Sequence, residues 1–210
     1  MRIAVFGATG QAGQLLVKKA LADGYEIVAY VRNPSKLEQT GERLTVIQGE
    51  LNDQASVEKA ITGAHAVVSV LGPHGRSRAK PLTIGMKNII AAMKNQGIHR
   101  LIITSTVSVK DSNDRPDFRF RLLVSIVKLL IRPAYEEILS VADVVRNSDL
   151  DWTLVRLSLL RNGHATGKIK VGYLGGGNVR IGITREDMVA FMLRQVEDTM
   201  YVRRSPAISN

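Results

Sequence analysis

The chain has 210 residues, 45% of them hydrophobic, which is enough to bury a core without cross-links. It contains no cysteine, so disulfides, thiolate metal sites and cysteine nucleophiles are excluded. The net charge of +10 suits an anionic ligand. The basic residues are dispersed, however, aromatic residues make up only 5%, and no nucleic-acid reader motif occurs, so we expect no nucleic-acid partner.

The sequence indicates neither a metal site nor a membrane span. The four histidines are scattered without metal-ligand spacing, so we expect no metal ion. No apolar run reaches the length of a membrane span. Met1 and Arg2 lead directly into the first predicted strand, with no signal peptide before it, and we therefore expect a cytoplasmic protein.

Apolar runs typical of buried parallel strands alternate with amphipathic helical patterns along most of the chain. The predicted strands are residues 2–6, 26–31, 44–47, 66–71, 101–103 and 152–157, and the predicted helices are residues 11–23, 54–62, 82–96 and 134–148. This pattern predicts an α/β fold, a doubly wound parallel sheet (Rossmann fold) forming one domain over residues 1–210. The expected strand order is 3-2-1-4-5-6, with a ligand bound across the switch point between strands 1 and 4.

The first predicted strand runs into a glycine-rich turn and then a helix. The glycines, Gly7, Gly10 and Gly13, follow the spacing G-x-x-G-x-x-G. Gly7 would allow a tight turn, Gly10 would let the backbone approach a pyrophosphate, and Gly13 would let the helix pack close to the strand. The helix N-terminus offers free N–H groups and a positive dipole end to an anion. We expect a dinucleotide site here; the alternative is a purely structural glycine turn.

The second predicted strand is followed by Arg32, with Ser35 and Lys36 close behind. NAD-specific sites usually place a carboxylate here for the ribose 2′-hydroxyl, yet no Asp or Glu occurs between residues 27 and 37. A guanidinium can hold a 2′-phosphate with paired hydrogen bonds, whereas a carboxylate would repel it. We therefore expect NADPH as the cofactor; the alternative for Arg32 is an exposed arginine on a loop.

The third, fourth and fifth predicted strands also end in residues placed to contact a dinucleotide. These are Glu50 and Leu51 near the adenine, Leu71 and Gly72 near the ribose, and Thr104, Ser105 and Thr106 beside the nicotinamide. Asp53 is predicted to cap the following helix instead. For the three hydroxyl residues, ordinary strand composition is an equal alternative.

A polar, proline-containing stretch at residues 110–118 predicts a mobile loop, and the apolar stretch at 118–132 predicts a helix that Pro133 terminates. Its polar residues Arg121, Ser125, Lys128 and Arg132 fall at helical spacing on one face. We expect this helix to be buried against the domain or against a second copy in a homodimer. A substrate-pocket lid and a membrane-surface helix are the alternatives.

A proton-transfer pair that many short-chain dehydrogenases use is missing. In that pair, a lysine four residues after a tyrosine lowers the tyrosine pKa. None of the five tyrosines has such a lysine, and Tyr135, where a catalytic tyrosine would be sought, is followed by Leu139. An alcohol–ketone reaction needs a proton donor at the carbonyl oxygen. Hydride transfer to a flavin, quinone or tetrapyrrole is easier to reconcile, because solvent or a hydroxyl can supply the proton.

The last third of the chain is less regular, and we expect it to form a small substrate region. Residues 172–178 have turn chemistry and are predicted to join short strands. Thr184 is predicted to be the N-cap of the next helix, with Asp187 reaching back to it, so we interpret Asp187 as a capping residue rather than a catalytic acid. Residues 107–132 and 157–183 are expected to supply the pocket elements.

These residues together resemble the atypical short-chain dehydrogenases of the NAD(P)H-binding, NmrA-like group, and within it the flavin reductase and biliverdin-IXβ reductase-like proteins. The resemblance covers essentially the whole chain and is carried by residues 7–13, 31–34, 104–106, 147–156, 183–187 and 206–210. Two positions depart from the group. Leu157 follows Arg156 where relatives usually have proline, and Glu50 stands where aspartate is commoner.

The resemblance implies roles for particular residues. Thr9, Gly10, Gln11 and Ala12 would hold the cofactor phosphates, Arg32 the 2′-phosphate, and Ser105 would be the catalytic hydroxyl near the nicotinamide. We therefore expect an NADPH-dependent reductase that transfers hydride to a small-molecule acceptor, a flavin or similar conjugated compound. The alternative is a non-catalytic NmrA-like sensor that reports NADP(H) levels to a partner. The short chain favours the enzyme, because 210 residues leave little for a partner module.

Overall fold

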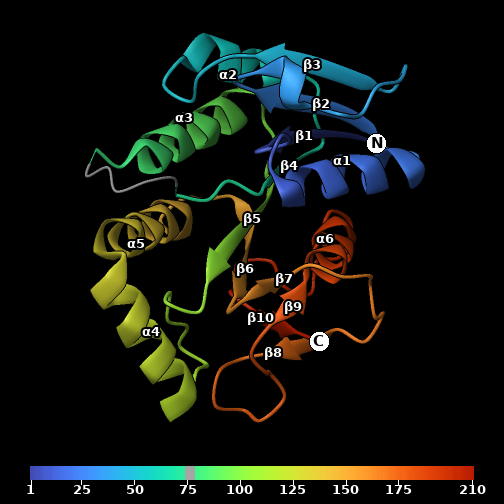
Figure 1. Cartoon of the computed structure of the whole chain (residues 1–210). Helices are drawn as coiled ribbons and strands as arrows, with labels where there is room; N and C mark the ends of the chain where they lie inside the picture. Colours follow the sequence, from blue (N-terminus) through green and yellow to red (C-terminus); the bar gives the residue numbers. More distant parts are fainter. Residues whose placement is uncertain (74–78) are drawn as a thin grey trace.

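An eight-stranded sheet with the order β3-β2-β1-β4-β5-β6-β10-β8 forms the centre of the computed structural model, which describes residues 1–73 and 79–210 (Figure 1). Its strands are β1 (Arg2–Phe6), β2 (Glu26–Val31), β3 (Leu44–Gln48), β4 (Ala66–Ser69), β5 (Arg100–Thr106), β6 (Asp151–Leu157), β8 (Lys170–Gly172) and β10 (Ala207–Ser209). A separate pair joins β7 (Leu160–Arg161) to β9 (Ile183–Thr184). The helices are α1 (Gln11–Ala22), η1 (Pro34–Lys36), α2 (Gln54–Ile61), α3 (Pro81–Asn95), α4 (Phe118–Leu130), α5 (Arg132–Arg146) and α6 (Arg185–Arg194).

The predicted strand order 3-2-1-4-5-6 is confirmed for β1 to β6. These strands are parallel, and Val5 of β1 lies opposite Ala29 of β2 on one side and Val68 of β4 on the other. Two short strands extend the sheet beyond β6: β10 runs parallel to β6, and β8 runs antiparallel to β10. The sequence predicts short strands beside the turn at residues 172–178, which fits β8, but it does not predict β10. The end of the chain is therefore part of the sheet.

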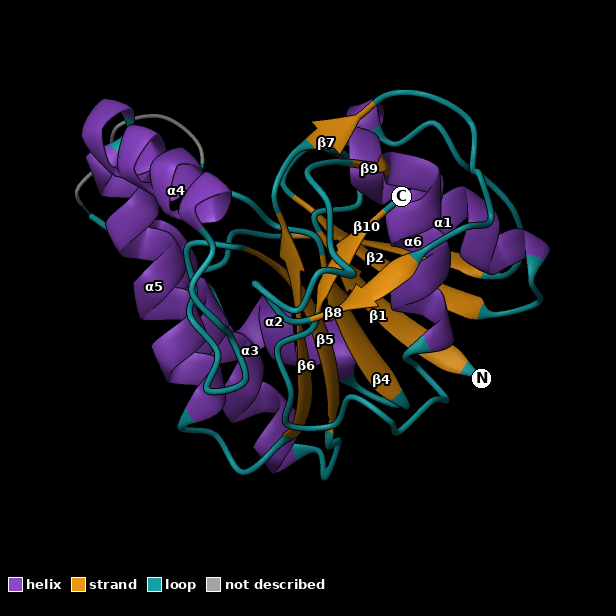
Figure 2. Ribbon diagram, turned by 90° about the horizontal axis from the view of Figure 1, so that it is seen from below, coloured by secondary structure: helices purple, strands orange, loops and turns teal. Residues whose placement is uncertain are grey.

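Helices cover both faces of the sheet (Figure 2). Alternate strand residues point to opposite faces, so Ala4 and Phe6 of β1 join the core beneath α2, α3 and α5. Ile3 and Val5 join the core beneath α1 and α6. This is the doubly wound arrangement that the alternation of strands and helices predicts.

The stretch at 118–132 differs from its prediction in two ways. The helix α4 ends at Leu130, and Pro133 lies in the first turn of α5 instead of terminating the preceding helix. A proline is tolerated there because the first N–H groups of a helix have no partner within it. Burial against the domain is also wrong, since Phe120 is the only buried residue of α4.

The predicted N-cap of α6 at Thr184 is confirmed, and Asp187 makes further hydrogen bonds that the sequence did not predict. The Thr184 hydroxyl accepts a hydrogen bond from the Asp187 N–H. The Asp187 carboxylate in turn accepts from the Thr184 and Thr166 hydroxyls and from the Asn210 side chain. Backbone N–H groups of Thr166 and Gly167 also donate to it. One carboxylate therefore fastens the 166–167 turn and the last described residue to α6.

The pKa of Asp187 reflects these contacts. Burial acts to raise it, but the hydrogen bonds from Thr166, Asn210 and Gly167 outweigh burial and lower the pKa to about 2. A carboxylate whose pKa is lower in the folded than in the unfolded chain stabilises the fold above its unfolded pKa. This contribution is lost as the pH falls through the folded value.

We predict that Asp187→Asn lowers the free energy of unfolding near neutral pH by about 2 kcal/mol, the equivalent of its pKa shift. The difference in the free energy of unfolding from the wild type should be constant above about pH 5 and should narrow as the pH falls toward 2. Urea unfolding of both proteins at a series of pH values measures this difference in the free energy of unfolding. Asp149→Asn, at a carboxylate that is 92% exposed, is the control. A difference that does not change with pH would contradict the assigned role.

Candidate cofactor site

The glycine turn between β1 and α1 is open at the helix N-terminus. Gly7 has φ +89°, a conformation that favours glycine, and its carbonyl accepts a hydrogen bond from the Gly10 N–H. Gly10 is the N-cap of α1, with no side-chain cap, and the first turn contains no acidic residue. The first N–H groups of α1 thus meet no competing carboxylate from their own turn, which suits an anion.

Each glycine of the turn faces a different environment. A Cβ placed on Gly13 would lie 2.0 Å from the Gly7 carbonyl oxygen, so α1 packs directly on the backbone of the turn. A Cβ on Gly7 would lie 3.1 Å from the Leu71 nitrogen, which brings the turn against the end of β4 at the switch point. A Cβ on Gly10 would meet only the Gly7 oxygen, at 3.6 Å. Gly10 is therefore the position where the fold itself leaves room.

A groove of about 590 Å³ opens beside this turn. It brings together four residues predicted for the cofactor site, Thr9, Gln11, Ser35 and Lys36. Five further residues that were not predicted for the cofactor site also line it: Gln14, Leu15, Glu38, Asn162, which lies in the predicted pocket element 157–183, and Arg185. The guanidinium of Arg185 donates to the Asn162 side-chain oxygen, so this hydrogen bond holds a second cation in the groove besides Lys36. No local motif identifies Arg185, because its neighbours indicate only a helix start.

The segment after β2 is organised by its own hydrogen bonds. Arg32 is exposed, and its guanidinium has no hydrogen-bond partner among residues 1–73 and 79–210. The Asn33 side-chain oxygen accepts from both the N–H and the hydroxyl of Ser35, which shapes the η1 turn. The Gln14 side chain on α1 bonds the Lys36 carbonyl and the Glu38 N–H, and so ties this segment to the glycine turn's helix. Glu38 is the first carboxylate after residues 27–37, which contain no Asp or Glu.

Of the two residues predicted to lie near the adenine, Leu51 packs on a helix and Glu50 is exposed. Leu51 packs on α3, where a Cβ on Gly85 would come within 2.7 Å of its side chain. The Glu50 side chain is exposed, while its carbonyl accepts from the Tyr30 hydroxyl. The prediction for Asp53 is confirmed, since its carboxylate accepts from the Ser56 N–H at the start of α2.

The end of β5 carries the three predicted hydroxyl residues. Ser105 is 8% exposed, and strand alternation puts it on the same face as Leu101 and Ile103, beneath α3 and α5. The Thr106 hydroxyl accepts from the Ser108 N–H and so shapes the turn after the strand. Thr104 lines a small cavity between the ends of β4 and β5, together with Leu71.

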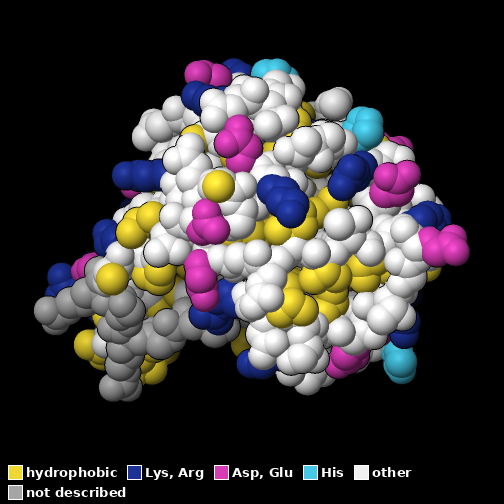
Figure 3. Space-filling view, turned by 90° about the horizontal axis from the view of Figure 1, so that it is seen from above, with side chains coloured by type: hydrophobic (Ala, Val, Ile, Leu, Met, Phe, Trp, Pro, Cys, Tyr) yellow, Lys and Arg dark blue, Asp and Glu magenta, His cyan; other side chains and the backbone are white. Residues whose placement is uncertain are grey.

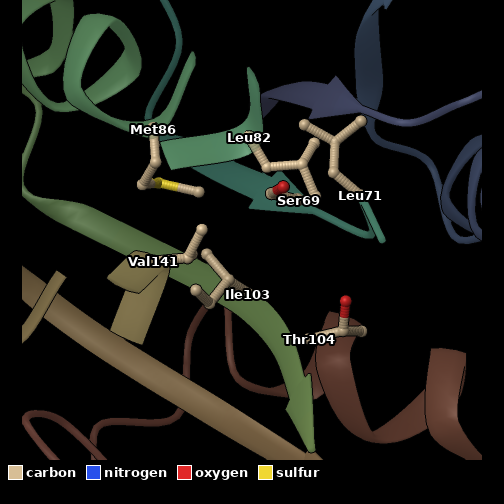
Figure 4. Close-up of a pocket in the computed structure, with 7 residues that line it drawn as sticks. All are labelled: Ser69, Leu71, Leu82, Met86, Ile103, Thr104 and Val141. Atoms are coloured by element: carbon tan, nitrogen blue, oxygen red, sulfur yellow. The ribbon is translucent and has the colours of Figure 1, made fainter. Parts of the chain in front are cut away.

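That cavity has a volume of about 20 Å³ and is largely apolar. It is lined by Ser69, Leu71, Leu82, Met86, Ile103, Thr104 and Val141 (Figure 4). Figure 4 shows Met86, Val141 and Ile103 converging on it from α3, α5 and β5, with Thr104 farther along β5. A cavity of this size holds about one water molecule, so it does not form a ring-sized pocket.

The loop after β5, which includes the stretch at 110–118 predicted to be mobile, makes hydrogen bonds to the sheet and to the segment after β8. The Asp114 carboxylate forms a two-pronged ion pair with Arg156 of β6, at 2.6 and 2.8 Å. Burial acts to raise the pKa of Asp114, but hydrogen bonds from Arg156, Asp111 and Leu174 lower it below its ordinary value. The Arg115 N–H also donates to the Leu174 carbonyl. The loop is thereby fixed to the sheet and to the segment after β8.

Tyr135, where a catalytic tyrosine would be sought, makes a contact between two helices. Tyr135 lies in the first turn of α5, and the Lys128 ammonium of α4 sits over its ring, 5.9 Å from the centroid. Glu137, on the next residues of α5, is buried and accepts a hydrogen bond from the Leu82 N–H at the start of α3. These side chains join helices to one another.

On the face seen in Figure 3, Lys and Arg side chains are interspersed with Asp and Glu and form no continuous patch.

Curated relatives resemble part of the chain. Dihydroflavonol 4-reductase from Hordeum vulgare is 30% identical over 152 residues, which cover 64% of this chain and 39% of that protein. Tetraketide alpha-pyrone reductase 1 from Arabidopsis thaliana is 31% identical over 133 residues, covering 54% of this chain and 41% of the relative. The chain thus matches only about two-fifths of the length of these relatives.

Solved structures match the whole chain. A short-chain dehydrogenase/reductase from Veillonella parvula, solved in complex with NADP, has a TM-score of 0.79 and 23% identity and covers 100% of this chain and 94% of its own. ChuY from Escherichia coli O157:H7, described as an anaerobillin reductase, has a TM-score of 0.81 and 19% identity, covering 100% and 97%. At these identities the likeness shows the fold.

A family model described as NAD(P)H-binding matches residues 7–199, from the first glycine of the turn to the segment after α6. This match includes the glycine turn, the segment after β2 and the ends of β4 and β5. The expected relationship is confirmed at this level: the chain belongs to the NAD(P)H-binding family of Rossmann-fold proteins.

Proposed function

We propose that this protein is an NADPH-dependent reductase that transfers hydride to a flavin or a similar flat, conjugated acceptor such as a quinone or a tetrapyrrole. The observation that carries the proposal is the open N-terminus of α1, which faces a groove containing Ser35, Lys36 and Arg185. A dinucleotide with three phosphates suits such a site, because it combines helix N–H groups with fixed cations.

The residues have distinct roles in this proposal. The first turn of α1, with Thr9, Gln11 and Ala12, binds the pyrophosphate through backbone N–H groups. Arg32, Ser35 and Lys36 hold the 2′-phosphate, which is the only feature that separates NADPH from NADH. The Glu38 carboxylate in the same groove opposes that preference, and the charged residues that line the groove are two cations, Lys36 and Arg185, and this one anion.

NADPH, when bound, supplies the hydride, and the chain's residues orient the acceptor and exclude water. Ser105, at the end of β5, is the hydroxyl that orients the acceptor or the nicotinamide. Solvent supplies the proton that the reduced acceptor takes up, because the chain lacks the Tyr–Lys pair of an alcohol dehydrogenase. The reductase names of the curated relatives and of ChuY support this class of chemistry.

A steady-state assay of NADPH oxidation with FMN, riboflavin, quinones and biliverdin tests the proposal directly. We expect turnover with at least one of these acceptors. Tight NADPH binding by calorimetry together with no oxidation by any acceptor would favour the non-catalytic NADP(H) sensor instead.

We predict that Gly10→Val abolishes NADPH binding but leaves the protein folded, because the fold leaves room at Gly10 where a pyrophosphate would lie. Gly13→Ala is the matched contrast. Its methyl group would overlap the Gly7 carbonyl, so it should lower the free energy of unfolding by several kcal/mol, on the scale of severe overpacking. Calorimetry and urea unfolding separate the two effects. Normal NADPH binding by Gly10→Val would mean that the turn is only structural.

We predict that NADPH binds more tightly than NADH and that Arg32→Ala weakens mainly NADPH, by about 1.5–3 kcal/mol for one charged hydrogen bond. Glu38→Gln should instead tighten NADPH binding, since it removes the one carboxylate that lines the groove in the described part of the chain. Calorimetric titration of both variants with both cofactors measures the differences. Equal affinity of the wild type for NADPH and NADH would contradict the assignment.

We predict that Ser105→Ala lowers kcat modestly, about tenfold for each 1.4 kcal/mol of lost transition-state contact, rather than abolishing activity. Tyr135→Phe should change kcat little, because Tyr135 has Leu139 in place of a lysine. Turnover with the best acceptor, measured beside NADPH affinity, is the readout. Loss of several orders of magnitude in Tyr135→Phe with normal NADPH binding would indicate a proton-relay dehydrogenase.

A further inference from the structure

The helix α4 has two apolar faces, and only one of them is covered. Its inner face, with Phe120, Leu123 and Val124, packs against Leu174 and Val179 in the segment between β8 and β9. Figures 1 and 2 show α4 projecting from the end of α5, away from the sheet. The inner contacts account for how α4 is held, and they leave the opposite side of the helix to solvent.

The uncovered side forms a continuous apolar stripe. Phe118, Leu122, Ile126 and Leu129 follow one another at helical spacings of four, four and three residues, so they share a face. They are 77%, 60%, 45% and 83% exposed. We call these four residues the outer stripe. Leu130 and Ile131 are also exposed and extend its C-terminal end. Clusters of exposed large apolar side chains of this kind mark interaction surfaces.

Cations border the outer stripe on both sides. At 100° per residue, Arg121 and Lys128 fall beside one edge and Arg119 beside the other. Arg119 pairs with Asp117, whereas Lys128 lies over the ring of Tyr135. Residues 118–132 contain no Asp or Glu, and the whole chain has a net charge of +10. An apolar stripe between basic flanks is the pattern of helices that lie in the interface of an anionic bilayer.

We propose that the outer stripe docks this protein on the surface of membranes that contain anionic lipids. The stripe would enter the boundary between headgroups and acyl chains, while Arg121 and Lys128 contact lipid phosphates. The helix lies on the surface and does not cross, because α4 has 13 residues and no helix of the described residues is long and apolar enough to span a bilayer. This inference is independent of the proposed reductase activity.

Charge favours a bilayer over a second copy of the chain as the occupant. In a two-fold homodimer each outer stripe would meet the other, and the same cations would approach one another. Asp117 pairs with Arg119, but residues 118–132 contain no carboxylate that could offset Arg121 and Lys128. An anionic lipid surface supplies the negative charge that a copy lacks.

Co-sedimentation with vesicles tests the proposal on the 210-residue chain. The wild type should bind vesicles of phosphatidylglycerol mixed with phosphatidylcholine, bind much less to phosphatidylcholine alone, and dissociate as salt is added. The double variant Leu122→Gln with Leu129→Gln should lower the partition coefficient by at least about tenfold. Ile84→Gln with Met200→Gln, at two other exposed apolar residues, is the matched control and should retain binding.

A second pair of variants tests the basic flank. Arg121→Gln with Lys128→Gln should weaken binding to the anionic vesicles, whereas Lys59→Gln with Lys87→Gln, which removes equal charge from exposed sites on α2 and α3, should change it little. Circular dichroism verifies that each variant is folded. Equal binding to neutral vesicles, or equal loss in the control variants, would overturn the proposal. So would a dimer in light scattering that the Leu122 and Leu129 changes dissociate, without vesicle binding by the wild type.

Discussion

The guanidinium of Arg156 is completely buried in β6, and the arrangement of the segments after β5 and β8 depends on how its charge is neutralised. An unpaired charge at such a site would be prohibitively costly, so Asp114 has to reach it from the loop after β5. The remaining donors bond the carbonyls of Val109 and Ser205. Because Asp114 also accepts from the Leu174 N–H, one ion pair joins β6, two loops and the segment that leads into β10.

The cofactor side is built on a different constraint, which is the absence of side chains. Gly13 lets α1 approach the Gly7 carbonyl, and Gly7 lets the turn approach the end of β4. These contacts lie within a few residues of one another or between adjacent strands. Such local contacts produce recognisable sequence patterns. The sequence therefore predicted the sheet order from β1 to β6, the glycine turn and the caps at Asp53 and Thr184.

What the sequence could not predict depends on long-range contacts. Asp114 and Arg156 are 42 residues apart, and nothing near either one identifies its partner. The same holds for Arg185, which reaches the cofactor groove from the start of α6, and for Asp187, whose local role as a cap concealed its bonds to Thr166 and Asn210. A short strand such as β10 gains its stability from the sheet it joins, so its own composition gives little signal.

The exposure of α4 follows from the same ion pair. The loop before α4 is tied to β6 through Asp114, and the inner face of the helix packs on the segment containing Leu174, which Asp114 also holds. The position of α4 is thus determined from within the chain, and its outer stripe contributes nothing to fixing it. Apolar side chains such as Leu122 and Leu129 are therefore not required there by the fold. On an exposed face bordered by cations, these side chains serve the proposed external surface rather than the packing of the domain.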